Sequence, residues 1–129
     1  MPAQHSRDVQ VVLSFYAAIR HRRVSDMLAV LHPEVCCYPL VGGYSNYYGH
    51  EAMTKLIDDV HNAHGDYQLD IHTITEAAIP RSGGVRITVQ ATVLPAPEHG
   101  NPVPVTTEFT LENGLITWIV SKPGASQGG

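Results

Sequence analysis

The sequence contains few cysteines, few positively charged residues and no long apolar run. Its two cysteines, Cys36 and Cys37, are adjacent in a chain of 129 residues. Neighbouring residues of a strand point to opposite faces, so a disulfide between these two would be strained and we expect free thiols. No window approaches about 18 apolar residues, and Met1–Asp8 has no apolar core, which argues against a membrane-spanning helix and a signal peptide. We therefore expect a cytoplasmic protein without a membrane partner.

Positive charge is also scarce, which limits the partners of the protein. Eight Lys and Arg residues against twelve Asp and Glu give a formal net charge of −4, and no basic run is longer than Arg22-Arg23. Nucleic-acid binding requires clustered positive charge that displaces counterions, so we expect no nucleic-acid partner. Hydrophobic residues at 43% and charged residues at 16% are typical of a globular protein. The length predicts one domain over residues 1–129, with an ordered core at about 6–121 and a loose tail at 122–129.

Helical periodicity fills the first half of the chain. Apolar residues at i, i+3, i+4 and i+7 predict a helix from about Ser6 to His21, with Ser6 as its N-cap. A second, short helix is predicted from its N-cap Ser25 to His32, because Pro33 disfavours helical geometry in the residue before it. A third helix is predicted to end at Gly65. The buried stripes of the first and third helices are Val12, Phe15, Tyr16 and Ile19, and Met53, Leu56, Ile57 and Val60.

Strand-like sequence fills the second half. Alternating residues, many of them β-branched, predict strands at Tyr67–Glu76, Val85–Leu94, Val103–Leu111 and Leu115–Ser121, after an earlier strand at Val35–Leu40. The sequence Glu112-Asn113-Gly114 predicts a tight turn, and Pro95–Pro104 is long enough to act as a flap. Helices followed by a meandering sheet predict an α+β fold, in which three N-terminal helices cover one face of an antiparallel sheet. We expect a pocket between the two layers.

Four motifs resemble the nuclear transport factor 2-like superfamily, and within it the SnoaL-like relatives of polyketide cyclases. They are Phe15–Ile19, Leu28–Val35, Tyr48–Met53 and Glu112–Trp118, within a resemblance that extends from Val9 to Val120. The resemblance implies a cystatin-like cone, in which three helices pack against a strongly curved sheet around a pocket. It also implies a homodimer that packs through the sheet.

The catalytic residues of the superfamily transfer poorly to this sequence. Where ketosteroid isomerase has its general-base aspartate, its oxyanion tyrosine and its protonated aspartate, this chain has Pro39, Phe15 and Thr107. We therefore do not expect isomerisation of the steroid type. The aspartate that often ends the last strand of SnoaL-like cyclases corresponds to Ser121 or Lys122, and no Asp-Arg-Asp set of the epoxide hydrolases is apparent. The histidine-aspartate chemistry of the dehydratases is not excluded.

Tyr38 and His72 are the candidate catalytic residues. Tyr38 lies at the end of the first predicted strand, where this fold keeps its chemistry, and a phenol is able to donate a proton to a substrate oxygen. His72 is a candidate base because imidazole titrates near neutral pH. The alternative for His72 is an ordinary sheet or interface histidine, since it faces away from the pocket if Leu69, Ile71 and Thr73 face into it.

The predicted ligand-binding residues come from the first helix and the last two strands. They are Phe15, Tyr16, Ile19, Thr107, Phe109, Trp118 and Ser121, although Trp118 suits a dimer interface equally well. His61 and His64 are spaced to share a metal ion, but no carboxylate completes the site, so we expect neither metal nor cofactor. Histidines at a helix C-terminus are also favoured by the helix dipole.

Two functions remain open on the sequence alone. The first is a cofactor-independent acid/base enzyme, an isomerase, dehydratase, cyclase or hydrolase, that acts on an apolar small molecule bearing oxygen. The second is a non-catalytic module that binds a small ligand or a protein partner with the same cone. Substitution of Tyr38 or His72 distinguishes them, because an enzyme loses turnover by roughly two to four orders of magnitude whereas a binder loses about 1 kcal/mol per hydrogen bond.

Overall fold

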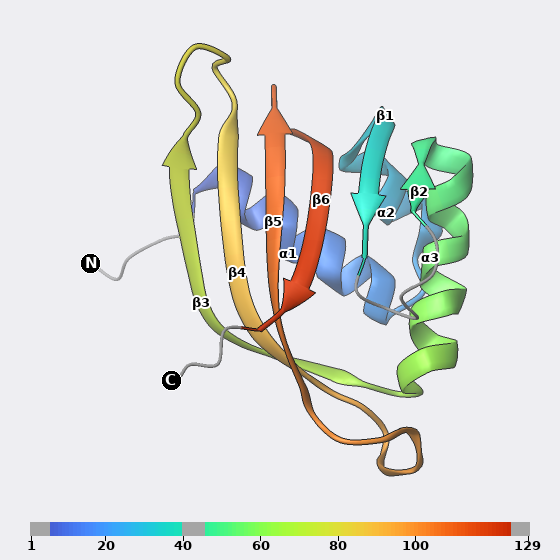
Figure 1. Cartoon of the computed structure of the whole chain (residues 1–129). Coiled ribbons are helices and arrows are strands. Elements are labelled where there is room, and N and C mark those ends of the chain that lie inside the picture. The colour runs from blue at the N-terminus through green and yellow to red at the C-terminus, as the bar shows by residue number, and fades with distance from the viewer. Residues whose placement is uncertain (1–5, 40–45, 125–129) are drawn as a thin grey trace.

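The computed structural model describes residues 6–39 and 46–124, which form three α-helices and a curved six-stranded sheet (Figure 1). The helices are α1 (Arg7–Arg20), α2 (Val24–Ala29) and α3 (Gly49–His64), and a short 3₁₀ turn, η2, covers Pro97–His99. The strands are β1 (Leu31–Tyr38), β2 (Tyr47–Tyr48), β3 (Gln68–Ala78), β4 (Val85–Leu94), β5 (Val103–Glu112) and β6 (Leu115–Pro123). The α+β class is confirmed, and the helices lie behind one face of the sheet (Figure 1).

The first and third helices follow the predicted periodicity. Ser6 caps α1 by accepting a hydrogen bond from the backbone N–H of Val9 at 3.1 Å. Gly65 ends α3 with a φ of 69°, a conformation that glycine adopts without a steric penalty. The apolar stripe of α3 is buried, so this helix packs against the sheet as expected: its members are Met53, Leu56, Ile57 and Val60.

The second helix is shorter than its sequence predicts. It begins at Val24 after Arg23, without a side-chain cap, and Ser25 lies inside it rather than at its N-cap. It ends at Ala29, and β1 begins two residues later, so the predicted helical end at His32 is wrong. Pro33 lies within β1 where the pairing with β6 is irregular. Proline is tolerated there because this position needs no backbone N–H for a hydrogen bond between strands.

The sheet is mixed rather than entirely antiparallel. Its strand order is β2-β1-β6-β5-β4-β3, in which β3 to β6 form an antiparallel meander, as predicted. The first strand, β1, runs parallel to β6, and the unpredicted strand β2 pairs antiparallel with β1 through Cys36 and Tyr48. The predicted end of the first strand at Leu40, the loop 41–45 and most of the predicted tail lie outside the described residues, although Lys122 and Pro123 belong to β6.

A β-bulge changes the alternation of β3. Ile71 pairs with Ala91 and Thr73 with Gln90, so His72 is the extra residue on this strand. Before the bulge, Leu69 and Ile71 face the helices; after it, Thr73 pairs with the exposed Gln90 instead of continuing that inner face. The predicted inward row of Leu69, Ile71 and Thr73 is therefore interrupted at His72.

Candidate functional site

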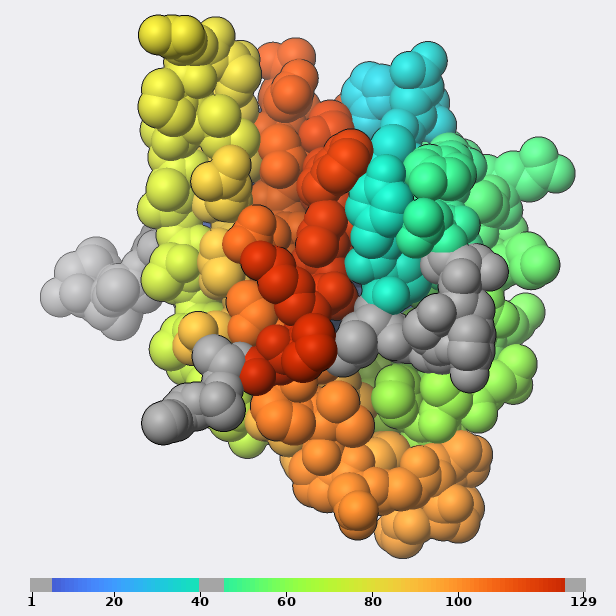
Figure 2. Space-filling model, viewed as in Figure 1, coloured from blue at the N-terminus to red at the C-terminus, as the bar shows by residue number. Residues whose placement is uncertain are grey.

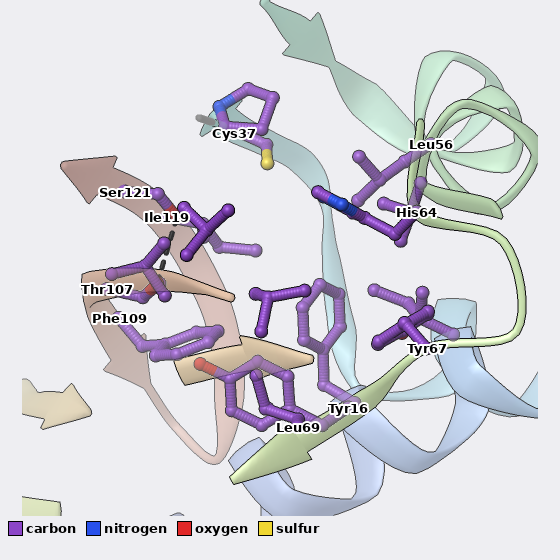
Figure 3. Close-up of a pocket in the computed structure, with 17 residues that line it drawn as sticks. Tyr16, Cys37, Leu56, His64, Tyr67, Leu69, Thr107, Phe109, Ile119 and Ser121 are labelled. Carbon is purple, nitrogen blue, oxygen red and sulfur yellow. Dashed lines mark hydrogen bonds between the residues drawn. The ribbon is translucent and has the colours of Figure 1, made fainter. Parts of the chain in front are cut away.

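A cavity of about 320 Å³ lies between the helices and the inner face of the sheet. This volume falls at the lower end of the range of small-molecule sites. Its walls come from α1, the C-terminal half of α3 and one end of the strands (Figure 3). The lining residues are Phe15, Tyr16, Ile19, Cys37, Pro39, Leu56, Val60, His64, Tyr67, Leu69, Val93, Val103, Val105, Thr107, Phe109, Ile119 and Ser121.

Three hydroxyl groups lie on one side of the cavity, those of Tyr16, Thr107 and Ser121, which we call the hydroxyl row. Thr107 of β5 and Ser121 of β6 are opposite each other in the strand register, and their hydroxyl oxygens are 2.9 Å apart (Figure 3). Burial raises the pKa of the Tyr16 phenol far above the ordinary value. Tyr16 therefore stays protonated at physiological pH, so the row presents neutral hydroxyl groups to the cavity.

Aromatic packing fixes the position of Tyr16. Its ring lies edge-on to Phe109, with ring centroids 5.5 Å apart, and Phe15 contacts Phe109 in the same way at 5.7 Å. Phe109 is completely buried in the middle of β5. The floor of the cavity is thus a rigid aromatic cluster that joins α1 to the sheet.

An imidazole and a second phenol lie on the opposite wall. His64 is in the last turn of α3 and Tyr67 follows that helix; their ring centroids are 6.1 Å apart (Figure 3). Burial, together with the neighbouring His99, lowers the pKa of His64, so its imidazole is neutral near pH 7 and able to accept a proton. Burial raises the pKa of Tyr67 to about 12. The two walls combine a neutral base with neutral hydroxyl donors.

The segment after β4 packs against the end of α3 beside this wall. The backbone N–H of Ala96 donates to the carbonyl oxygen of His64 at 2.9 Å. A Cβ added at Gly65 would lie 2.8 Å from the His99 ring, so glycine is required here for close approach. The predicted flap at Pro95–Pro104 is therefore attached to α3, and Val103 at its end lines the cavity.

The cavity lining lacks formal charge. Of its residues within 6–39 and 46–124, none is Asp, Glu, Lys or Arg. Cys37 directs its sulfur into the cavity (Figure 3) and burial raises the pKa of its thiol to about 12, so this group is also neutral. A site of this composition suits an apolar molecule that carries one or a few oxygen atoms.

Six of the seven predicted ligand-binding residues line the cavity. They are Phe15, Tyr16, Ile19, Thr107, Phe109 and Ser121. The seventh, Trp118, lies on the outer face of β6 and is 42% exposed, because it alternates with the inward-facing Ile119.

The structure does not bring Tyr38 and His72 together. Tyr38 packs on the outer face, with its ring centroid 5.0 Å from that of Trp118 and 6.0 Å from that of Tyr48. His72 is exposed at the bulge of β3, where its Nε2 atom lies 2.8 Å from the Thr92 hydroxyl oxygen. Neither residue is among those that line the cavity, so the candidate acid and base of the sequence lie on the opposite face of the sheet.

His64 is the main residue that sequence reasoning missed. It continues the stripe of α3 at a spacing of four residues from Leu56 and Val60, and all three line the cavity. That spacing was the available signal, but on the sequence alone His64 is interpreted only together with His61, as one of two histidines that the dipole favours at the C-terminus of a helix. The structure separates the two: the Nε2 atom of His61 is 2.9 Å from the carbonyl oxygen of Ile19.

No three His, Cys, Asp or Glu side chains gather as a metal site anywhere in the described parts of the chain. Likewise, none of the helices in those parts has the length and apolar character needed to cross a bilayer.

Solved structures with the same fold span nearly the whole chain. TerC co-crystallised with polyporic acid is 18% identical, with a TM-score of 0.66 and 92% of each chain covered. A candidate polyketide cyclase from Sinorhizobium meliloti is also 18% identical, with a TM-score of 0.71 over 88% of this chain and 94% of the other. The orange carotenoid protein of Anabaena, bound to canthaxanthin, is 14% identical with a TM-score of 0.73; the match covers 90% of this chain and 36% of that protein. At these identities the likeness establishes the fold alone.

Sequence comparison defines the family more directly. A search of curated protein sequences finds no significant match. The family profile of the SnoaL-like domain matches residues 12–119, which include both walls of the cavity except Ser121. The predicted resemblance is therefore confirmed, and this chain belongs to the SnoaL-like domain family of the nuclear transport factor 2-like superfamily.

Proposed function

We propose that the protein binds an apolar, oxygen-bearing small molecule in the cavity and transfers a proton to or from it, with His64 as the base. The observation that carries this proposal is the arrangement of a neutral imidazole across an apolar cavity from a row of hydroxyl groups. Burial lowers the pKa of His64 below its ordinary value, so the imidazole is neutral at pH 7 and is able to accept a proton as a general base. The hydroxyl row supplies hydrogen bonds to a substrate oxygen.

The hydroxyl row has protons to offer to a ligand. Tyr16, Thr107 and Ser121 carry three O–H groups, and the hydrogen bond between Thr107 and Ser121 uses one of these protons. The remaining O–H groups are able to donate to an oxygen of the ligand. Such a donor stabilises negative charge that develops on a carbonyl oxygen when a base removes a neighbouring proton.

Two structural neighbours support the class of ligand. TerC was crystallised with polyporic acid and the carotenoid protein with canthaxanthin. The present cavity is lined mainly by aliphatic and aromatic side chains, which suits ligands of this kind. We therefore propose an aromatic or polyene-like ligand with carbonyl or hydroxyl oxygens.

A thermal-shift screen with apolar ketones, phenols and quinones tests this proposal. A ligand present at about 100 times its Kd adds roughly 2.7 kcal/mol to stability. Each ligand that raises Tm is then incubated with the protein in D₂O, and hydrogen exchange or product formation is followed by NMR. For an enzyme, His64→Gln lowers turnover by roughly 100-fold to 10,000-fold. The absence of any bound ligand in the screen would contradict the proposal.

A non-catalytic binding protein is the second candidate, and the lack of a carboxylate among the cavity-lining residues described favours it. In that case bound ligands show no exchange or conversion, and removal of one hydrogen-bonding group, as in Tyr16→Phe, weakens binding by about 1 kcal/mol. The matched variant Tyr48→Phe on the outer face should leave the affinity unchanged.

We also propose a homodimer that packs through the outer face of the sheet. The rings of Tyr38, Tyr48 and Trp118 form a cluster there, and Tyr48 and Trp118 are 57% and 42% exposed. Aromatic clusters of this kind are enriched at interfaces. The strands that carry them, β1, β2 and β6, form one continuous surface (Figure 2).

Light scattering after size-exclusion chromatography tests the dimer. Trp118→Arg should weaken association by about 2 kcal/mol or more, which is roughly 30-fold in Kd. Val24→Arg on α2 alters another exposed apolar residue away from the sheet and serves as the control. A wild-type protein that is monomeric at high concentration would contradict this proposal.

A further inference from the structure

We infer that the cavity takes its ligand as a neutral species and rejects the carboxylate form of an otherwise identical molecule. This inference rests on the proposed function, and it narrows the ligand class to ketones, quinones, phenols or esters. The reason lies in the positions of the cationic side chains next to the cavity, and in the number of hydrogen bonds that its walls are able to make.

Two cationic residues follow cavity-lining residues directly in the sequence, but their side chains point away from the cavity. Lys122 follows Ser121 on β6 but lies on the outer face, where its Nζ atom is 3.6 Å from the Oε2 atom of Glu108. Arg20 follows Ile19 on α1, and its Nε donates to the carbonyl oxygen of Tyr67 at 2.8 Å. The alternation of the strand and the turn of the helix thus keep both charges out of the cavity lining.

Four titratable groups face the cavity, and all of them are neutral near pH 7. The pKa of His64 is lowered, and the pKa values of Tyr16, Tyr67 and Cys37 are raised. A buried carboxylate without a positive partner is strongly disfavoured, and it binds a proton or stays in water instead.

The hydroxyl row does not compensate for the missing charge. Of its three O–H groups, at most two are left to donate, because the hydrogen bond between Thr107 and Ser121 uses one, whereas a carboxylate has about four acceptor sites to satisfy. The rest of the lining near this row is apolar and includes Val105, Phe109 and Ile119. A ketone is therefore matched to this wall and a carboxylate is left with unmet hydrogen-bonding capacity.

Two probes of nearly the same shape test the inference: 2-acetylnaphthalene, a neutral ketone, and 2-naphthoic acid. Their affinities are measured by calorimetry at pH 5 and pH 8. A carboxylic acid with a pKa near 4 is almost wholly ionised at pH 8, so its binding should fall by about 100-fold or more between the two pH values. The ketone should bind at pH 8 with an affinity within about threefold of that at pH 5.

A change of charge in the cavity provides the converse test. Ser121→Lys places an ammonium group at the hydroxyl row, and it should strengthen binding of naphthoate at pH 8 by about tenfold or more, as expected for a charge-assisted hydrogen bond. Thr88→Lys makes the same change in net charge on the outer face, where Thr88 pairs with Glu108, and should have no such effect.

The outcomes separate the inference from the proposed function. Binding of the acid as tightly as the ketone at pH 8 would overturn the inference and leave the proposed function intact. If His64→Leu abolishes this binding of the acid at pH 8, then His64 supplies the positive charge, and that result also overturns the inference. Failure of every neutral probe, in this pair and in the wider screen, would overturn both.

Discussion

The two faces of the sheet carry different chemistry, although each strand contributes alternately to both. The inner face is buried and aliphatic or aromatic, and its polar atoms include the hydroxyl groups of Thr107 and Ser121, which are hydrogen-bonded to each other. The outer face is exposed and carries threonines, charged pairs such as Lys122 with Glu108, and the aromatic cluster of Tyr38, Tyr48 and Trp118. Residue type alone therefore does not indicate which face holds the site, since phenols and imidazoles occur on both.

The largest expected difference between the faces is in stability. Phe109→Ala removes a completely buried ring that contacts Phe15 and Tyr16, and it should lower the free energy of unfolding by about 3–5 kcal/mol. Trp118→Ala removes a larger ring from the outer face and should lower the stability of the monomer by about 1 kcal/mol or less. Urea denaturation at low protein concentration measures both. Equal losses would contradict the assignment of the two faces.

Two threonines of neighbouring strands provide a finer comparison. Thr107→Val keeps the shape of a buried side chain but leaves the Ser121 hydroxyl without its partner, so it should cost about 1–3 kcal/mol. Thr88→Val on the outer face should change stability by less than about 0.5 kcal/mol. The same denaturation experiment checks both variants, and a neutral Thr107→Val would show that the hydroxyl row is not stabilising.

The pH dependence of stability should report on His64 at the cavity wall. The pKa of His64 is lower in the folded protein than the ordinary value of 6.5, so the unfolded chain binds a proton more readily. The contribution of His64 to the free energy of unfolding is therefore fully present above about pH 6.5. It is lost as the pH falls below that value, because the folded state resists protonation. Between pH 7.5 and pH 5.5, His64→Gln should therefore lose less stability than the wild type. Urea denaturation at the two pH values measures this difference.

The smallest effect is expected from His72 on ligand binding. His72 lies on the outer face and contacts Thr92, so His72→Ala should leave the affinity for any cavity ligand within about twofold. Calorimetry with a ligand identified in the screen measures this. A large loss of affinity or turnover would restore His72 as a catalytic candidate and would contradict the assignment of the site to the inner face.

Hydrophobic periodicity predicts most of the helices and strands of this fold, because each of them buries the residues of one face. The stripe of α3, the cap of α1 and the antiparallel meander are local features, and residues within a few positions of one another determine them. Periodicity also places six of the predicted residues in the cavity lining: Phe15, Tyr16 and Ile19 lie on one face of α1, and Thr107, Phe109 and Ser121 lie at inward positions of paired strands.

The features that sequence did not predict depend on long-range pairing. The parallel contact of β1 with β6 joins residues more than 80 positions apart, and it places Tyr38 beside Val120 on the outer face. The bulge at His72 shifts the alternation of β3, and only the pairing with β4 reveals it. His64 was missed for another reason: a polar residue at the end of an apolar stripe has the same pattern whether it faces water or a cavity.

The adjacent thiols offer a practical consequence of this alternation. Cys36 is half-buried on the outer face between Tyr48 and Trp118 in the strand register, whereas Cys37 is 1% exposed and lines the cavity. Because the thiolate is the reactive form, the raised pKa of Cys37 should make it the slower of the two to alkylate. A change in the rate at Cys37 would then report that the cavity is filled, and a change at Cys36 that the outer face is covered. The chain thus carries two built-in chemical reporters at consecutive positions, one for each surface.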